Sequence, residues 1–384
     1  MKPLRITMVC GPFYPTPPAP TGAVQRLWYD LCVRFAQKGH HVTVLAKHAE
    51  GQATDETVDG VRVLRRTAMR QGRNVRIDIL RDFYYSLRMA LLAQSADILV
   101  TNAFWSPVLA RLMGRRFGKT YVSVGRFPKG QMFLYRKCDR IHVCTSAIRD
   151  AVLAEIPDAA DRTKVVPYPI LTDVFVPPST PRRETGARTL LYTGRVHPEK
   201  GVHLLIEAFA RLRARHPDLQ LKVVGPTAVA DGAGGDEYLS KLRGLAGGHS
   251  VEFHPAIYGR PDLARCLQEA HFYCYPSLAE KGETFGIAPL EAMATGLPTV
   301  VSALQCFRDF VRPGENGLVF DHRDADPVTR LEETFERLLS EPGLARRLGD
   351  AAAVTAKGFG YDAVADLYLA DFRTLLGQEA AAAR

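Results

Sequence analysis

The sequence predicts an α/β protein made of two Rossmann-like, doubly wound domains that face each other across a cleft. Three observations predict this fold class. The 384 residues exceed what one typical core accommodates. Short apolar segments alternate with amphipathic ones in the first half, and the pattern restarts after a proline-rich stretch from Pro167 to Pro181. Strands separated by helices in this way form a parallel sheet with right-handed crossovers.

The first domain is expected to span residues 1–178. Its apolar segments predict strands at 4–10, 42–46, 97–101, 120–124 and 140–144. Its amphipathic segments predict helices near 23–38, 80–94, 106–117 and 146–155.

The second domain is expected to span residues 186–358. Strands are predicted at 189–193, 219–224, 271–275 and 298–302. Helices are predicted near 201–215, 236–245, 261–269, 286–295 and 326–340. A last helix near 361–376 carries the apolar residues Leu367, Tyr368, Phe372 and Leu375. Ligands of open α/β sheets bind beyond the carboxyl ends of the strands, so a site is expected between the two domains.

Composition is that of a globular protein, with 46% hydrophobic and 24% charged residues. The first strand begins at Leu4, directly after Met-Lys-Pro, which predicts no signal peptide, and no apolar stretch is long enough for a spanning helix. The seven cysteines are scattered, and neither they nor the eleven histidines have metal-ligand spacing. We therefore expect reduced thiols, no metal site and a cytoplasmic location.

Basic residues are concentrated in the first domain. Eight arginines lie between Arg62 and Arg88, opposed only by Asp78 and Asp82, and the whole chain carries a net charge of +9. This density favours an anionic partner, either a phosphorylated acceptor, acidic lipid headgroups at the inner face of the membrane, or nucleic acid. Few aromatic residues interleave with the arginines, so nucleic acid is the least supported. The alternative is a solvated face without a partner.

Residues 276–298 carry the strongest functional pattern. They leave a strand, pass through a loop containing Glu283 and enter a helix near Gly286, whose apolar face is formed by Leu290, Met293, Ala294 and Leu297. The backbone N–H groups of Phe285, Gly286 and Ile287 can bind an anion at the helix start. Glu283 and Glu291 flank that position. A nucleotide-sugar has the matching parts, a diphosphate for the helix start and hydroxyls for the carboxylates.

This segment, Glu-x-Phe-Gly followed by Glu-Ala-Met-Ala-x-Gly-x-Pro, resembles the Glu-x7-Glu signature of retaining nucleotide-sugar glycosyltransferases of family 4, which have the GT-B fold. The resemblance implies that Glu283 contacts the donor sugar and Glu291 the ribose. It also implies an acceptor-side first domain, a donor-nucleotide-binding second domain, and a C-terminal helix (359–384) that crosses back to the first domain. A UDP- or GDP-sugar is then the co-substrate, no further cofactor is expected, and the acceptor is a hydroxyl of a glycan, a lipid-linked or a small molecule.

A second segment, Tyr-Thr-Gly-Arg-Val-His-Pro-Glu-Lys-Gly-Val, places Arg195 at the end of a strand, after Gly194, and Lys200 just before a helix. Both cations can reach a diphosphate, Arg195 as a fork and Lys200 as a point charge. The segment resembles the family's Gly-Arg…Lys-Gly element, which implies that the two cations neutralise the leaving diphosphate.

Three positions depart from the family pattern. The loop after the first strand retains Gly22 as a donor-binding glycine, but Ala23 follows where the family has a second glycine. Gly125 or Arg126 stands where the family often carries a histidine. Tyr168, within Pro-Tyr-Pro, replaces part of a Pro-Asn-Gly element.

Two other functions remain open at this stage. A GT-B epimerase or phosphorylase would keep the fold and change the chemistry. A basic binding protein for anionic membrane or nucleic acid would have a degenerate GT-B site.

Overall fold

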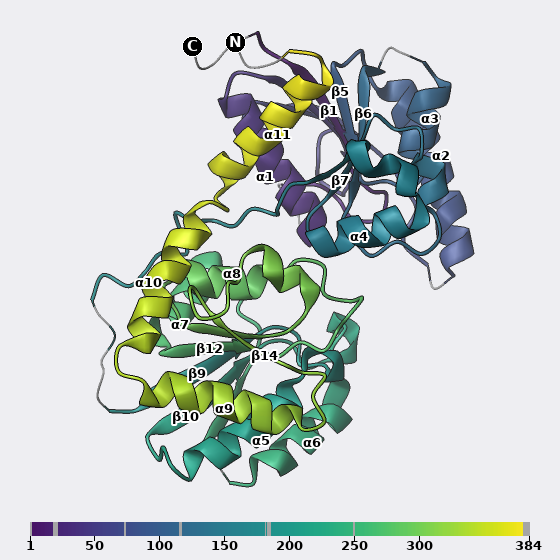
Figure 1. Ribbon diagram of the computed structural model, residues 1–384. Coiled ribbons are helices and arrows are strands. Elements are labelled where there is room, and N and C mark those ends of the chain that lie inside the picture. The colour runs from purple at the N-terminus through teal and green to yellow at the C-terminus, as the bar shows by residue number, and fades with distance from the viewer. Residues whose placement is uncertain are drawn as a thin grey trace, which may run out of the picture. The chain divides into compact units, whose positions relative to one another are not determined.

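The computed structural model describes residues 2–17, 22–72, 74–114, 117–180, 182, 186–248 and 250–378, so Arg73, Arg115 and Arg116 lie outside the described residues. The chain forms two compact units (Figure 1). The first comprises Met1–Pro169 and Tyr361–Arg384, and the second Ile170–Gly360.

The first boundary differs from the expected one at residue 178, because the segment after Pro169 is bonded to the second unit. The Ile170 N–H donates to the carbonyl of Phe359 at 2.8 Å, and the Gln268 side chain donates to the carbonyl of Val176 at 2.8 Å.

A mostly parallel sheet of eight strands forms the centre of the first unit, in the order β3-β4-β2-β1-β5-β6-β7-β8. Among the strands that the structure describes in this sheet, only the β3–β4 pair is antiparallel. The strands are β1 (Arg5–Val9), β2 (His41–Lys47), β3 (Asp55–Val58), β4 (Val61–Arg66), β5 (Ile98–Thr101), β6 (Lys119–Val124), β7 (Arg140–Val143) and β8 (Thr163–Val165).

Three of these strands, β3, β4 and β8, are additions to the sequence prediction. The hairpin of β3 and β4 turns at Asp59 and Gly60, whose φ angles of 52° and 79° are those of a tight two-residue turn. Val58 and Val61 then pair directly across the hairpin.

The helices of the first unit cover both faces of its sheet. They are α1 (Ala23–Gln37), α2 (Val75–Leu92), α3 (Ser106–Leu112), α4 (Ser146–Glu155) and α11 (Tyr361–Leu375). Tyr85 and Met89 of α2 and Ala110 of α3 pack in one buried cluster with Leu99 of β5. Helix α2 begins five residues before its expected start, because Asn74 caps it by accepting from the N–H of Arg76.

The C-terminal helix α11 packs on the other face of the same sheet, as the family resemblance implied. Its Tyr368 ring lies 5.2 Å from Trp28 of α1, and its Phe372 ring lies 4.9 Å from Tyr121 of β6. Tyr121 pairs with Val100, the neighbour of Leu99, and alternation along a strand places Tyr121 on the face opposite the Leu99 cluster.

The second unit contains a fully parallel sheet of six strands in the order β11-β10-β9-β12-β13-β14. The strands are β9 (Arg188–Thr193), β10 (Leu219–Val224), β11 (Val251–His254), β12 (Phe272–Tyr275), β13 (Thr299–Ser302) and β14 (Leu318–Phe320). After β9, the chain adds β10 and β11 on one side of that strand. It then crosses back and adds β12, β13 and β14 on the other side. The sheet therefore has a topological switch point between β9 and β12, where ligands bind in such folds.

The helices of the second unit are α5 (Val202–Arg213), α6 (Gly235–Ala246), α7 (Arg260–Glu269), α8 (Ile287–Ala294), α9 (Pro327–Ser340) and α10 (Leu344–Lys357). Short 3₁₀ helices in the chain include η2 (Met132–Tyr135), η3 (Pro157–Arg162), η4 (Pro198–Lys200), η5 (Val229–Asp231) and η6 (Gln305–Asp309). Helix α10 and strands β11 and β14 were not expected from the sequence.

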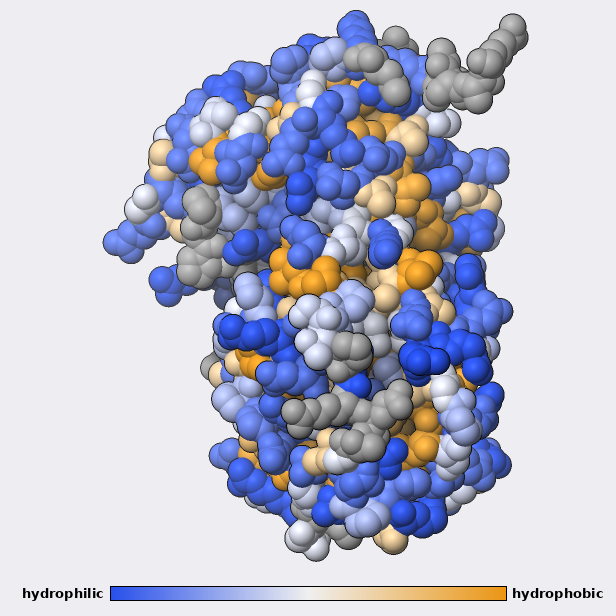
Figure 2. Space-filling model, turned by 90° about the vertical axis from the view of Figure 1, so that its left-hand side faces the viewer, coloured by the Kyte–Doolittle hydropathy of each residue, from blue (hydrophilic) through white to orange (hydrophobic). Residues whose placement is uncertain are grey.

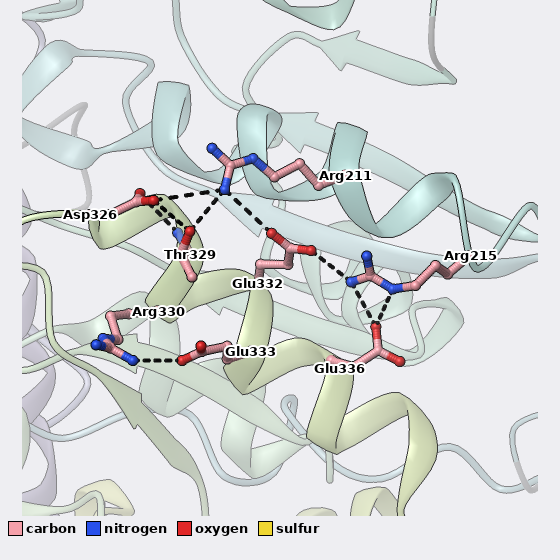
Figure 3. Close-up of polar contacts among 8 residues, drawn as sticks. All are labelled: Arg211, Arg215, Asp326, Thr329, Arg330, Glu332, Glu333 and Glu336. Atoms are coloured by element: carbon pink, nitrogen blue, oxygen red, sulfur yellow. Dashed lines mark hydrogen bonds and ion pairs between the residues drawn. The ribbon is translucent and has the colours of Figure 1, made fainter.

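Helices α5 and α9 are joined by charged side chains (Figure 3). Arg211 lies 3.4 Å from Glu332, and Arg215 lies 2.7 Å from Glu332 and 2.9 Å from Glu336. The face of the molecule drawn in Figure 2 is mainly hydrophilic, with separate hydrophobic patches. Within the described residues, no helix is long and apolar enough to cross a membrane.

Candidate active site

The loops that follow β9 and β12 meet at the switch point of the second sheet. The first loop carries Arg195 and Lys200, and the second carries Glu283. A backbone hydrogen bond of 2.7 Å from the Leu278 N–H to the carbonyl of Glu199 joins them. Ser302 of β13 holds the second loop by donating to the carbonyl of Ser277 at 2.5 Å.

Gly201 allows this close approach of the two loops. Its φ angle of 67° is in the left-handed region, and a Cβ atom at this position would collide with the carbonyl oxygen of Pro276. The backbone geometry that brings the two loops together therefore requires glycine at position 201.

Lys200 and Glu283 form an ion pair, with Lys200 Nζ 2.7 Å from Glu283 Oε2. The two side chains are only 7% and 11% exposed. Lys200 Nζ also lies 5.6 Å from the centre of the Tyr275 ring, at the end of β12. A buried ammonium group with three N–H donors can keep the carboxylate and still donate to a bound anion.

Arg195 is anchored from two directions at the end of β9. Its guanidinium lies 2.8 Å from Glu199 Oε1 and donates to the carbonyl of Gly232, in the loop after β10. The side chain is 40% exposed, so other N–H donors of the fork remain accessible to a ligand. Gly194, with φ of 151°, precedes it, and the Gly194 N–H donates to the carbonyl of Val224 at 3.0 Å.

Helix α8 begins at Ile287, one residue after Gly286, close to the start expected from the sequence. Gly286 has φ of 93°, and a Cβ atom there would contact the Phe307 ring. The Phe285 side chain is buried, with its ring 5.6 Å from that of Phe310, so it packs in the interior of the unit. The first N–H groups of a helix have no acceptor within the helix, which makes this end suited to an anion.

Glu291 lies in the second turn of α8 and pairs with Arg260, at the start of α7. Its Oε1 atom lies 2.8 Å from Arg260 Nη1, while the Glu291 side chain is 7% exposed. Burial raises the pKa of Glu291 to about 7, and the positive charge of Arg260 acts in the opposite direction.

The structure thus brings Lys200 and Glu283 into direct contact and connects Arg195 to the same pair of loops. Gly22 belongs to the first unit, where it precedes α1 and a Cβ atom would collide with the side chain of Gln25.

Sequence reasoning missed Glu199 and Arg260 as partners of the predicted residues. The i, i+4 spacing of Arg195 and Glu199 was a usable signal, whereas nothing in the sequence pointed to Arg260.

Two departures from the family pattern meet in the first unit. A Cβ atom at Gly125 would collide with the hydroxyl oxygen of Tyr168, which is buried. A side chain such as histidine at position 125 is therefore excluded by Tyr168.

All seven cysteines lie within the described residues, are buried and form no disulfide bond there. Within the residues that the structure describes, no group of three or more His, Cys, Asp or Glu side chains is arranged to hold a metal ion.

Comparison with known proteins identifies the family of the chain. Residues 179–355 match the family model described as glycosyl transferases group 1, and residues 24–174 match that of glycosyltransferase family 4. The two matches together cover most of the chain. The chain belongs to the GT4-type glycosyltransferases of GT-B fold.

Individual relatives of this glycosyltransferase are distant. A D-inositol 3-phosphate glycosyltransferase from Arthrobacter sp. strain FB24 is 31% identical over 225 residues, covering 57% of this chain and 51% of that protein. A glycogen synthase from Mycobacterium tuberculosis is 26% identical over 396 residues, covering 91% and 89%. The chain spans about half the length of the D-inositol 3-phosphate glycosyltransferases it matches.

The fold is shared with solved structures of the same type. A sucrose-phosphate synthase from Thermosynechococcus elongatus superposes with a TM-score of 0.77 at 20% sequence identity, covering 97% of this chain and 99% of that chain. The predicted fold class, two parallel-sheet α/β domains of GT-B type, is confirmed.

Proposed function

We propose that this glycosyltransferase moves a sugar from a nucleotide-diphosphate donor, a UDP- or GDP-sugar, to a hydroxyl group of an acceptor with retention of anomeric configuration. The observation that carries the proposal is the buried Lys200–Glu283 pair at the switch point of the second sheet. It joins a cation suited to a diphosphate and a carboxylate suited to sugar hydroxyls. We further propose that Arg195 and Lys200, rather than a metal ion, neutralise the charge of the diphosphate.

Arg195, Lys200 and the start of α8 bind the diphosphate. Cleavage of the bond between the sugar C1 atom and the phosphate oxygen leaves negative charge on the diphosphate. Cations already held in place stabilise that charge in the transition state without reorganising. The Arg195 fork is held by Glu199 and the Gly232 carbonyl, and Lys200 is held by Glu283.

Glu283 accepts hydrogen bonds from the donor sugar. Its Oε2 atom is engaged by Lys200, so its other oxygen is the one that faces the sugar hydroxyls. Because the same lysine contacts both the carboxylate and the diphosphate in this arrangement, the sugar and its leaving group are positioned by one pair of side chains.

Glu291 accepts hydrogen bonds from the ribose hydroxyls. Its Oε1 atom receives the Arg260 hydrogen bond, which leaves Oε2 for the ribose. The ionised form is the better acceptor, and Arg260 favours that form against the effect of burial.

In the transfer step, the acceptor oxygen forms a bond to C1 on the face from which the diphosphate departs. The acceptor proton passes to an oxygen of the leaving phosphate. No protein side chain is assigned as general base.

A thermal-shift panel of UDP, GDP, ADP and dTDP tests donor binding, because a ligand that binds only the folded state raises the melting temperature. The nucleotide that stabilises the protein then identifies the sugar donors to be tried with hydroxyl acceptors. NMR of the product's anomeric proton should show the same configuration as the donor. Stabilisation by none of the four nucleotides, or an inverted product, would contradict the proposal.

A further inference from the structure

Helix α2 of the first unit has its acidic residues on the inside. Its two carboxylates, Asp78 and Asp82, are only 8% and 4% exposed. Asp82 accepts from the backbone N–H groups of Phe104 and Trp105 at the start of α3, at 3.2 and 2.9 Å. Asp78 accepts from the N–H of Gly72 and pairs with Arg81 at 2.8 Å. Both acidic residues are therefore committed to holding neighbouring segments.

The outward surface of the same helix is apolar. Ile77, Leu80, Tyr84 and Leu91 are 47%, 69%, 51% and 66% exposed. Their spacing of three, four and seven residues places them in one stripe along the helix. Val75, at the first position of the helix, is exposed as well. A helix on the surface of a globular domain normally turns polar residues to solvent, so an apolar row on the outward side of α2 is unusual.

Arginines lie within and beside this stripe. Arg76, Leu80, Tyr84 and Arg88 follow one another at intervals of four, so a cation stands at each end of the row. The Arg88 guanidinium donates to the carbonyl of Thr67 at 3.0 Å and lies 5.7 Å from the centre of the Tyr84 ring. Because both carboxylates of α2 point inward, no acidic side chain of the helix offsets these charges.

Fewer arginines of the 62–88 cluster are available to a partner than the sequence suggested. Arg65 is fully buried and paired with Glu56, and Arg62 pairs with Asp55 at 2.8 Å. Arg65 is therefore enclosed within the unit, and Arg62, which is 41% exposed, already has a carboxylate partner. The basic charge available to a partner is concentrated at α2 and at the exposed Arg70 before it.

Helix α9 of the same protein is an internal comparison. Its charged residues are in ion pairs: Arg330 with Glu333 on α9 itself, and Glu332 and Glu336 with Arg215 of α5 (Figure 3). Helix α2, which runs along the outside of the first unit in Figure 1, has a row of apolar residues in the corresponding place. The row of exposed apolar residues on α2 therefore contrasts with the paired charges of α9.

We propose that the outer face of α2 binds the surface of an anionic lipid bilayer, with the helix lying in the plane of the interface. Ile77, Leu80 and Leu91 enter the boundary between headgroups and acyl chains, and Arg76 and Arg88 contact the anionic headgroups. Leucine side chains 66% or more exposed favour burial, and the cations select a negatively charged surface. This attachment goes beyond sugar transfer and is independent of the second unit's site.

Co-sedimentation of the full chain with vesicles tests the proposal. Wild-type protein should bind vesicles of phosphatidylcholine mixed with phosphatidylglycerol, should bind vesicles of phosphatidylcholine alone much less, and should detach as salt increases. The double variant Leu80→Ser/Leu91→Ser should lose roughly tenfold or more in vesicle affinity. The double variant Arg76→Gln/Arg88→Gln should lose about fivefold for each arginine.

The matched control is Val354→Ser, an equally exposed apolar residue (68%) on α10, which should bind vesicles like wild type. Unchanged melting temperatures of all variants show that the fold is intact. No binding of wild type to the anionic vesicles, or full binding by Leu80→Ser/Leu91→Ser, would overturn the proposal. A wild-type dimer in light scattering that this variant converts to monomer, without vesicle binding, would show that the face contacts a second copy instead.

Discussion

Lys200 Nζ lies 2.7 Å from Glu283 Oε2, although the two residues are 83 positions apart in the sequence. They meet because β9 and β12 are neighbours at the switch point, and because Gly201 lets the two following loops touch. The pair is nearly buried, so each charge depends on the other for compensation. This mutual dependence makes its contribution to stability measurable separately from catalysis.

Removing one partner of this pair should be costly. Lys200→Met and Glu283→Gln should each lower the free energy of unfolding by about 3–5 kcal/mol at most, since each leaves a buried group without its partner. The double variant should lose less than the sum of the two. Urea unfolding of all four proteins gives the coupling energy. Strictly additive losses would mean that the two side chains do not interact.

Arg195→Gln should lower the rate of transfer by about 30- to 1000-fold, because a lost charge-assisted contact to the leaving diphosphate costs about 2–4 kcal/mol in the transition state. Arg188→Gln is the matched control: Arg188 lies at the other end of β9 and pairs with Asp218 at 2.5 Å. It should leave the rate within about twofold, since it loses only an ion pair at the edge of the unit. EDTA should leave wild-type activity intact. Equal losses in both variants, or a strict need for Mg²⁺, would show that Arg195 does not have this role.

Nucleotide affinity should depend on the ionisation of Glu291. Its pKa of about 7 means that protonation begins near neutral pH, so binding of the nucleoside diphosphate should weaken as pH falls below 7. Arg260→Gln removes the positive charge that lowers this pKa, so its affinity should begin to fall at a higher pH. Titration calorimetry across pH measures both profiles. The Glu291→Gln variant is the control, because its remaining pH dependence comes from ionisation of the nucleotide's own phosphates. Identical profiles for Glu291→Gln and wild type would contradict the assignment.

The raised pKa of Glu291 also predicts that the stability of the protein depends on pH. Its pKa rises on folding from 4.5 to about 7, so between these pH values the folded state holds a proton that the unfolded state has released. Stability from this group is therefore complete below about pH 4.5 and is lost as pH rises toward 7. Glu291→Gln should gain stability relative to wild type across this window, by about 3 kcal/mol at most. Urea unfolding at several pH values measures the difference, and a constant difference would show that the pKa is not raised.

Gly125 and Tyr168 should be energetically coupled. Gly125→Ala should destabilise the protein by about 1–3 kcal/mol, because its Cβ atom would collide with the Tyr168 hydroxyl. Gly125→Ala/Tyr168→Phe should recover most of that loss, since the second change removes the oxygen. Thermal unfolding of the single and double variants checks this. A double variant no more stable than Gly125→Ala would place the strain elsewhere.

Much of the fold could be predicted from the sequence because most helices and strands depend on local residue patterns. The helix expected at 286–295 is Ile287–Ala294 in the structure, and the strand expected at 219–224 is Leu219–Val224. Periodicity and the flanking Gly and Pro residues determine such elements. The hairpin of β3 and β4 was overlooked although Asp59-Gly60 is a turn signal. Strand β14 has only three residues, which is too short for periodicity to detect.

Side-chain partners were less predictable, since they depend on long-range geometry. The counter-ion of Glu291 is Arg260, 31 residues away on another helix. Arg65 looked like a member of an exposed cluster, but on β4, between β3 and β2, its side chain is buried. The apolar outward face of α2 was not predicted either, because charge density alone did not show that Asp78 and Asp82 turn inward.

Titration calorimetry of the stabilising nucleoside diphosphate with wild type, Glu283→Gln and Glu291→Gln tests the assignment of the site most directly. Glu291→Gln should bind the nucleotide about 10- to 100-fold more weakly, because a hydrogen bond to a charged group is lost. Glu283→Gln should bind it within about fivefold of wild type and yet lose sugar transfer, because its carboxylate contacts the sugar rather than the nucleotide. If Glu283→Gln lost nucleotide binding while Glu291→Gln kept it, or if both variants bound and turned over like wild type, the account of this site would be wrong.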